Sequence, residues 1–114
     1  MTKKGHYADV TAKVPTEEGC KDVTIRWLIS KDDGAKNFAM RLFEVQPGGY
    51  TPYHQHDWEH EVFILEGDGE LKLADGPKPY TSGEFIYIPA MEWHQFKNTG
   101  KKLNRFLCLV PYKG

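Results

Sequence analysis

Glycine and proline gather in short clusters that interrupt the chain at close intervals. The 114 residues include 11 glycines and 7 prolines. These residue types tolerate positive φ angles or preset a bend, so each cluster predicts a turn. The predicted turns contain Pro47-Gly48-Gly49, Gly67-Asp68-Gly69, Asp75-Gly76-Pro77, Ser82-Gly83 and Asn98-Thr99-Gly100. A chain interrupted this often can form only short elements.

The segments between the turns are rich in β-branched and aromatic residues, and none has the apolar spacing of a helix. The predicted strands cover residues 22–30, 37–46, 61–66, 70–73, 84–88, 94–97 and 103–110. Seven or more short strands joined by close turns favour a sandwich or barrel. A chain of 114 residues has room for one such domain. The fold class is therefore predicted to be all-β, with a single domain.

Charge and hydropathy exclude several classes of partner. Lysine and arginine number 15 against 16 aspartates and glutamates, so no excess positive charge is available for nucleic acid. No apolar run approaches the roughly 18 residues of a membrane-spanning helix, and residues 1–5 lack the apolar segment of a signal peptide. We therefore expect a cytoplasmic protein with no nucleic-acid or membrane partner. Cys20 and Cys108 are too far apart to indicate a zinc ribbon.

Histidines are clustered in the middle of the chain. His54 and His56 are two residues apart, so on a strand their side chains project from the same face. His60 shares their parity if the strand continues, whereas a loop at residues 57–59 would fold its ring back toward the same centre. Imidazole is a common ligand of transition metals, and His94 begins a later strand. The four histidines together predict a metal site.

Two segments around these histidines resemble the two motifs of the cupin family. The matching residues are Gly48, His54, His56 and Gly67 in the first segment, and Gly83, Pro89, His94 and Asn98 in the second. The resemblance implies a cupin jelly-roll barrel, a double-stranded β-helix, over residues 21–114. Residues 1–20 are polar and weakly patterned, and we expect them to form an N-terminal arm or a swapped strand.

The chain departs from the usual first motif at His60, where cupins commonly carry a glutamate. In this respect it resembles a four-histidine subset of small cupins, to which residues 40–43, 58–67 and 106–111 are also similar. That similarity implies one divalent transition metal on His54, His56, His60 and His94. Manganese is the first choice, with iron, zinc, nickel and copper as further possibilities.

An alternative keeps a carboxylate as the fourth ligand, from Glu59 or Glu61, with His60 facing away. Glu61 has the opposite parity to Val62, which we expect to face inward, and this disfavours it. A second departure is Met91, at a position where the second motif usually has glycine. We expect Met91 to alter the turn before His94 without removing the ligand.

Candidate pocket residues flank the ligands or lie on strands that a jelly roll turns inward. They are Tyr53, Trp58, Phe63 and Phe106, each of which ordinary core packing also explains. Arg41 interrupts an apolar strand, and a buried arginine needs a partner. By similarity to the four-histidine cupins, Arg41 reaches the pocket and binds an anionic or oxygen-rich substrate group. The alternative places it on an outward face or at a subunit interface.

Cys108 lies between two leucines, a setting typical of a small buried hydrophobe. The same resemblance places Cys108 near the metal. Arg41 and Cys108 are therefore the candidate catalytic residues.

Four neutral ligands would leave positions of an octahedral metal open for chemistry. The leading functional hypothesis is a metal-dependent oxidoreductase of the dioxygenase type, which uses O2 or peroxide on a small organic substrate. The alternatives are a metal-anchored module that binds or senses a small molecule, and a metal-dependent isomerase. We also expect a homodimer, because a barrel this small leaves a strand edge exposed that a second copy can cover.

Overall fold

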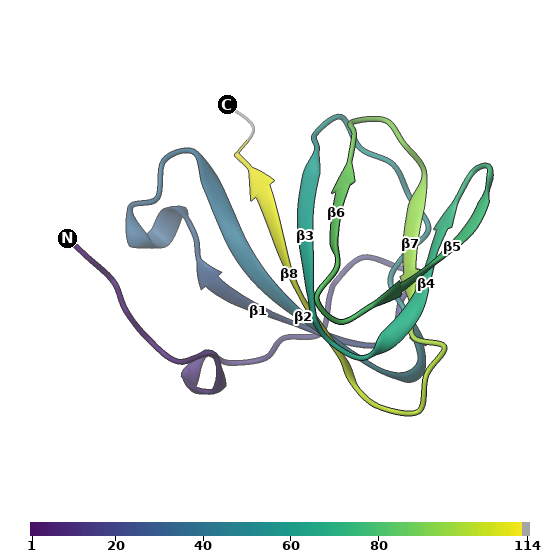
Figure 1. Ribbon diagram of the computed structural model, residues 1–114. Coiled ribbons are helices and arrows are strands. Elements are labelled where there is room, and N and C mark those ends of the chain that lie inside the picture. The colour runs from purple at the N-terminus through teal and green to yellow at the C-terminus, as the bar shows by residue number, and fades with distance from the viewer. Residues whose placement is uncertain (113–114) are drawn as a thin grey trace.

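A computed structural model of the chain describes residues 1–112, and their regular structure is almost entirely β. Two short 3-10 helices are present, η1 (Tyr7–Asp9) and η2 (Lys31–Asp33). The strands, labelled in Figure 1, are β1 (Lys21–Ile29), β2 (Phe38–Tyr50), β3 (His60–Glu66), β4 (Asp68–Leu73), β5 (Gly76–Thr81), β6 (Phe85–Ile88), β7 (His94–Lys97) and β8 (Asn104–Pro111). Both helices are three residues long, so no helix within residues 1–112 could cross a membrane.

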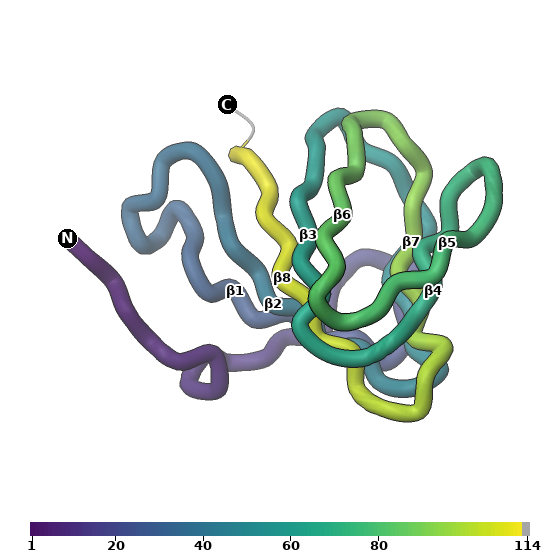
Figure 2. The backbone as a smooth tube through the Cα atoms, in the orientation of Figure 1, coloured from purple at the N-terminus to yellow at the C-terminus, as the bar shows by residue number. Residues whose placement is uncertain are grey.

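The strands form one antiparallel sheet that curls around an interior. Their order is β5-β4-β7-β2-β8-β3-β6, and β1 pairs with β2 outside this path. The curl brings β4, β5 and β7 opposite β3, β6 and β8, as the tube in Figure 2 shows. The predicted all-β jelly-roll barrel with a single domain is confirmed.

Aromatic side chains fill the centre of the barrel. Phe106 of β8 is 1% exposed, and its ring stacks on Phe43 of β2 at 5.1 Å and on Phe96 of β7 at 4.6 Å between centroids. Stacked rings of this kind contribute roughly 0.5–1.5 kcal/mol each beyond the area they bury. The stack therefore joins β2 and β8 to β7 across the interior.

Strand parity decides which side chains of β3 face this interior. His60, Val62 and Ile64 are buried, whereas Glu61 and Phe63 are exposed on the opposite face. Successive side chains on a strand point to opposite faces, so a ligand at position 60 shares its face with the core. The inward parity predicted for His60 is correct.

The predictions miss one strand, β5, and place one turn wrongly, at residues 47–49. β5 was missed because Gly76, Pro77 and Pro79 resemble a turn, yet proline is compatible with an edge strand, and β5 pairs only with β4. The turn predicted at residues 47–49 lies inside β2. Gly48 has a φ of 81° and the pairing of β2 with β1 shifts register nearby, so β2 bends there and does not end.

Two residues of the cupin-like motifs show how the turns near the site are built. Gly67 has a φ of 90°, and a Cβ atom there would overlap the side chain of Asn104. Met91 has a φ of 66°, the left-handed conformation that glycine favours, and its N–H donates to the carbonyl of His56 at 2.7 Å. Met91 thus adopts a conformation that glycine favours, and whether the turn differs from that of a cupin with glycine there stays a prediction.

A buried carboxylate ties the N-terminal arm to the sheet. Glu44 is 7% exposed and accepts hydrogen bonds from Arg26 Nε at 2.7 Å and from Arg105 Nε at 2.8 Å. Arg26 in turn donates to the carbonyl of Val10 in the arm at 2.6 Å. Burial raises the pKa of Glu44, but the two arginine hydrogen bonds outweigh burial and the pKa is lowered overall.

Candidate metal centre

Three separate segments bring the four histidines together. His54 and His56 lie on the connection between β2 and β3, His60 opens β3 and His94 opens β7. The backbones of His54 and His94 are hydrogen-bonded to each other in both directions, at 3.2 and 3.0 Å. Residues 57–59 form a bend, so His60 reaches the cluster by the loop route.

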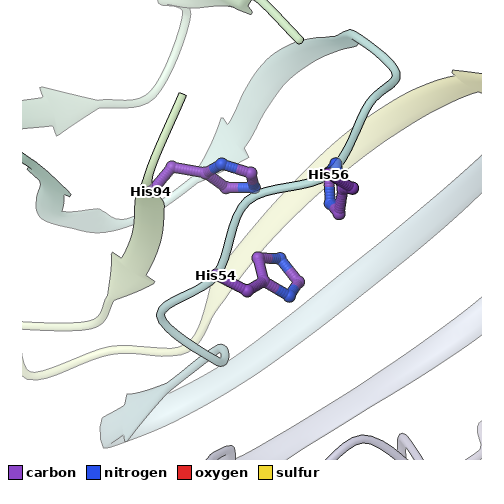
Figure 3. Close-up of side chains that lie close together, drawn as sticks. All are labelled: His54, His56 and His94. Atoms are coloured by element: carbon purple, nitrogen blue, oxygen red, sulfur yellow. The ribbon is translucent and has the colours of Figure 1, made fainter. Parts of the chain in front are cut away.

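The imidazoles surround one small space. His54, His56 and His94 each offer a nitrogen, and these three atoms lie within 4.8 Å of one another. Figure 3 shows the three side chains gathered from their separate segments. The ring centroid of His60 lies 4.4 Å from that of His56 and 5.1 Å from that of His94. The Nε2 atoms of His56 and His60 face each other at 2.9 Å. This arrangement directs several nitrogen atoms at one point.

The nitrogens on the far side of two rings, those of His54 and His94, have partners of their own. His54 Nδ1 lies 2.5 Å from Glu17 Oε2, and His94 Nδ1 lies 2.9 Å from the carbonyl oxygen of Glu92. A carboxylate and a carbonyl can only accept, so both Nδ1 atoms carry hydrogen and both Nε2 atoms keep a free lone pair. Metal-binding histidines are oriented in this way, and the donor set therefore fits a divalent metal ion.

Burial keeps three of the clustered rings neutral, those of His56, His60 and His94. It lowers the pKa of His60 to about 2 and the pKa of His56 to about 4, and in each case the neighbouring histidines lower it further. Burial also lowers the pKa of His94. A histidine must be neutral to ligate, so these rings are ready for a metal at neutral pH.

The carboxylates considered as alternative ligands lie elsewhere. Glu59 Oε2 accepts a hydrogen bond from the hydroxyl of Tyr87 at 2.6 Å. Glu61 is exposed on the outward face of β3, opposite Tyr87 of β6. Neither side chain shares the inward face of His60.

A cavity of about 720 Å³ opens beside the histidines. Most of its wall is apolar, and the residues that line it include Val23, Ile25, Trp27, Phe43, Phe96 and Phe106. Of the predicted pocket residues, Trp58 and Phe106 line this cavity, and Trp58 stacks on His56 at 4.2 Å.

Tyr53 and Phe63 are not among the lining residues, which corrects the prediction for both. Tyr53 is 37% exposed and stacks on Trp93 outside the cavity. Phe63 has the outward parity of β3 and is 43% exposed. Strand parity explains the position of Phe63, because residues an odd number apart on a strand face opposite sides.

Arg41 and Cys108 both line the cavity and contact each other. Arg41 Nη2 lies 3.1 Å from Cys108 Sγ, and the same sulfur lies 3.2 Å from His60 Nδ1. The guanidinium packs over the rings of Trp27 and Phe43. Its Nε atom is buried and has no hydrogen-bond partner within residues 1–112. A cation in this setting can receive an oxygen atom of a ligand.

Glu17 is a charged residue of the site that the sequence did not reveal. It belongs to the N-terminal arm, lines the cavity and contacts His54 from 37 positions away in the chain. Nothing in the local sequence signals this contact, because it depends on how the arm folds back onto the barrel.

Among solved structures, the polyketide cyclase RemF from Streptomyces resistomycificus is similar over almost the whole chain. The two are 42% identical with a TM-score of 0.94, and the match covers 99% of this chain and 81% of that one.

Curated relatives match over shorter stretches. The 1-methylthio-D-xylulose 5-phosphate methylsulfurylase of Rhodospirillum rubrum is 34% identical over 71 residues, which are 62% of this chain and 46% of that protein. The gentisate 1,2-dioxygenase of Ralstonia sp is 33% identical over 57 residues, 49% of this chain and 16% of that protein. The chain spans about half or less of the length of these relatives.

The sequence model of the cupin domain family matches residues 41–110 of this chain. This stretch includes all four clustered histidines as well as Arg41 and Cys108. The match covers more than half of the chain and agrees with the curled antiparallel sheet. The protein is therefore a member of the cupin domain family.

Proposed function

We propose that the protein is a metal-dependent cyclase that closes rings in a small poly-β-ketone, with a divalent ion held by His54, His56, His60 and His94. Cupins generally bind a divalent metal, and three of these histidines lie close together. The observation that carries the proposal is a cluster of four imidazoles, without a carboxylate at position 60, on the wall of a large apolar cavity. The 42% identity to a polyketide cyclase over 99% of the chain supports it.

The proposed reaction is an intramolecular aldol condensation. When bound, a divalent ion on four neutral ligands keeps its full positive charge and acts as a Lewis acid toward carbonyl oxygens. The methylene between two carbonyls loses a proton to water, and its carbon forms a bond to a ketone carbon farther along the same molecule. The C=O π bond of that ketone breaks, and its oxygen takes a proton back from water to become a hydroxyl. The resulting hydroxyl leaves with a neighbouring proton as water. Atoms and electrons balance without an oxidant.

The chain's own residues provide orientation and a dry site. Trp27, Phe43 and Phe106 give the cavity flat apolar walls that exclude water and can hold a folded chain of ketones. Arg41 lines the cavity, and in this proposal its guanidinium donates to an enolate or ketone oxygen of that chain. Positioning of this kind favours one fold of the substrate, and hence one ring, over others.

The second candidate is the predicted oxidoreductase of the dioxygenase type, acting with O2 or peroxide on a small organic molecule. The similarity of 57 residues to a gentisate 1,2-dioxygenase favours it. Imidazole ligands suit manganese, iron, zinc, nickel and copper, so the donor set is compatible with either reaction. Manganese remains our first choice of metal, from the resemblance to four-histidine cupins.

The two functions predict different products from the same assay. The metal-loaded protein is incubated with a synthetic linear triketone or tetraketone, with and without O2, and the masses of the products are determined by mass spectrometry. We expect a cyclic product lighter by one water per ring, formed equally without O2 and abolished by removing the metal. Substrate loss coupled to O2 consumption would support the dioxygenase. Tight binding with no conversion under either condition would indicate a binding module and contradict both enzymatic proposals.

We also propose that the protein forms a homodimer through the outer face of β3 and β6. Phe63 and Phe85 face each other across these strands and are 43% and 84% exposed, and Leu65 and Tyr87 extend the same apolar surface. A second copy would remove this surface from water.

We expect light scattering to give the mass of a dimer for the wild type and of a monomer for Phe85→Asp.

A further inference from the structure

The carboxylate of Glu17 stands behind one of the clustered histidines. Glu17 Oε2 accepts a hydrogen bond from His54 Nδ1 at 2.5 Å, so the Nε2 lone pair of His54 is left for the centre of the cluster. The Glu17 side chain is 54% exposed and that of His54 is 26% exposed. An exposed contact of this kind contributes little stability by itself. Its position behind a ligand suggests a role that depends on the metal.

Several contacts hold Glu17 in this place. Lys13 and Ile25 are hydrogen-bonded to each other in both directions, at 2.9 and 2.8 Å, which fixes the arm beside β1. Gly19, with a φ of 89°, lies against Pro52 and allows the sharp turn after Glu17. Cys20 packs on the core and its Sγ contacts the carbonyl of Glu17 at 3.5 Å. The turn at residues 17–20 is thus anchored on both sides, and it carries its carboxylate to the histidine.

The carboxylate of Glu17 can offset part of the positive charge of a metal ion bound to the histidines. All four clustered imidazoles are neutral ligands, so none of them offsets the charge of a divalent ion. Among residues 1–112, Glu17 is the carboxylate that lines the cavity, whereas Glu59 and Glu61 face other surroundings. An ion on His54 Nε2 would polarise the Nδ1–H group and strengthen its hydrogen bond to a carboxylate.

We propose that Glu17 is a positioning residue of the metal centre, and that metal binding and docking of the turn at residues 17–20 stabilise each other. This inference rests on the proposed metal site. Glu17 holds His54 in the tautomer and orientation that ligation requires. It also supplies a negative charge that contacts the ligand His54 and not the ion itself. By thermodynamic linkage, the ion must stabilise the docked turn by the same factor with which the docked turn raises metal affinity.

The test compares Glu17→Ala and Glu17→Gln with the matched control Glu18→Gln, whose native side chain is exposed on the same turn. Affinity for manganese and zinc is measured by competition with a chelator. We expect Glu17→Ala to weaken binding by about 10- to 100-fold. Glu17→Gln keeps an acceptor oxygen, so it should recover part of this loss. Glu18→Gln should bind like the wild type.

A second measurement separates coupling to the metal from a purely structural role of the arm. Hydrogen exchange of the amides of residues 14–20 is followed with and without metal. Metal should slow this exchange in the wild type and in Glu18→Gln, and should leave it unchanged in Glu17→Ala. A variant that merely loosened the arm would exchange faster in the absence of metal yet still respond to it, and that result would overturn the proposal.

Failure of this inference and failure of the proposed function give different results. If Glu17→Ala binds metal within about twofold of a wild type that binds tightly, the positioning role is wrong and the metal site stands. If the wild type binds no divalent metal, the proposed metal site itself is wrong.

Discussion

Replacement of His94 by alanine is expected to lower the affinity for a divalent metal by about 100- to 1,000-fold. Binding at a four-ligand protein site is worth about 10–16 kcal/mol in total, so one ligand in four accounts for roughly 2.5–4 kcal/mol. His94 is 4% exposed, and its ring is already oriented by the carbonyl of Glu92. Isothermal titration with manganese and zinc measures the change.

His6→Ala is the matched control for this experiment. His6 lies in the N-terminal arm, where its Nδ1 accepts a hydrogen bond from the N–H of Ala8 at the start of η1. The variant loses a histidine without touching the cluster, so its metal affinity should equal that of the wild type. Equal binding by His94→Ala would contradict the four-histidine site, provided that the circular dichroism spectrum shows an intact β fold.

Glu44→Gln is expected to lower the free energy of unfolding by about 2–4 kcal/mol. The substitution keeps the shape of a nearly buried side chain but leaves Arg26 and Arg105 without their shared counter-charge. Removing one member of a buried ion pair is costly because the remaining charge stays desolvated. Urea denaturation monitored by tryptophan fluorescence measures the loss.

The control for this variant uses the same arginine. Glu66 pairs with Arg105 at 2.9 Å, but its side chain is 54% exposed. Glu66→Gln should therefore cost less than about 1 kcal/mol. Similar losses from the two variants would mean that burial does not set the strength of the Glu44 contacts.

The dependence of this effect on pH follows from the lowered pKa of Glu44. A carboxyl group whose pKa is lower in the folded state stabilises the fold above its ordinary value, here 4.5, and loses that contribution as the pH falls through the folded-state pKa. The wild type should thus lose its advantage over Glu44→Gln on acidification below pH 4.5. A difference between the two that stays constant from pH 7 to pH 3 would contradict the ionic role.

Local patterns in the sequence predict most of the strands, and the exceptions share a cause. β7 has the predicted bounds, residues 94–97, because a turn precedes it and a polar cluster follows it. The local patterns miss β5 and the end of β2, residues 47–50, because their glycines and prolines look like turns. The residues of β5 are tolerated because β5 is an edge strand in a hairpin with β4. The end of β2 instead pairs with strands distant in the sequence, β1 and β7, and a local pattern cannot represent that pairing.

The same limit separates the site residues that could be predicted from those that could not. The histidines carry a spacing that the chemistry of metal binding makes recognisable, and the structure gathers all four. Glu17 has no such signal, since its contact with His54 depends on the turn at Gly19 and on the path of the arm. Tyr53 and Phe63 were misplaced because sequence proximity to a ligand does not determine which face a side chain occupies.

Because the histidines lie on three segments, the stability and the lifetime of the folded protein would depend on the free metal concentration. An ion held by His54, His56, His60 and His94 would join the irregular connection after β2 to β3 and β7. Such an ion binds the folded chain and not the unfolded one, so each tenfold rise in free metal above the dissociation constant adds about 1.4 kcal/mol to the stability. The fraction of molecules open to proteases falls by the same factor of about ten when opening requires loss of the ion. The cellular lifetime of the protein would then report the free metal concentration, independently of any substrate.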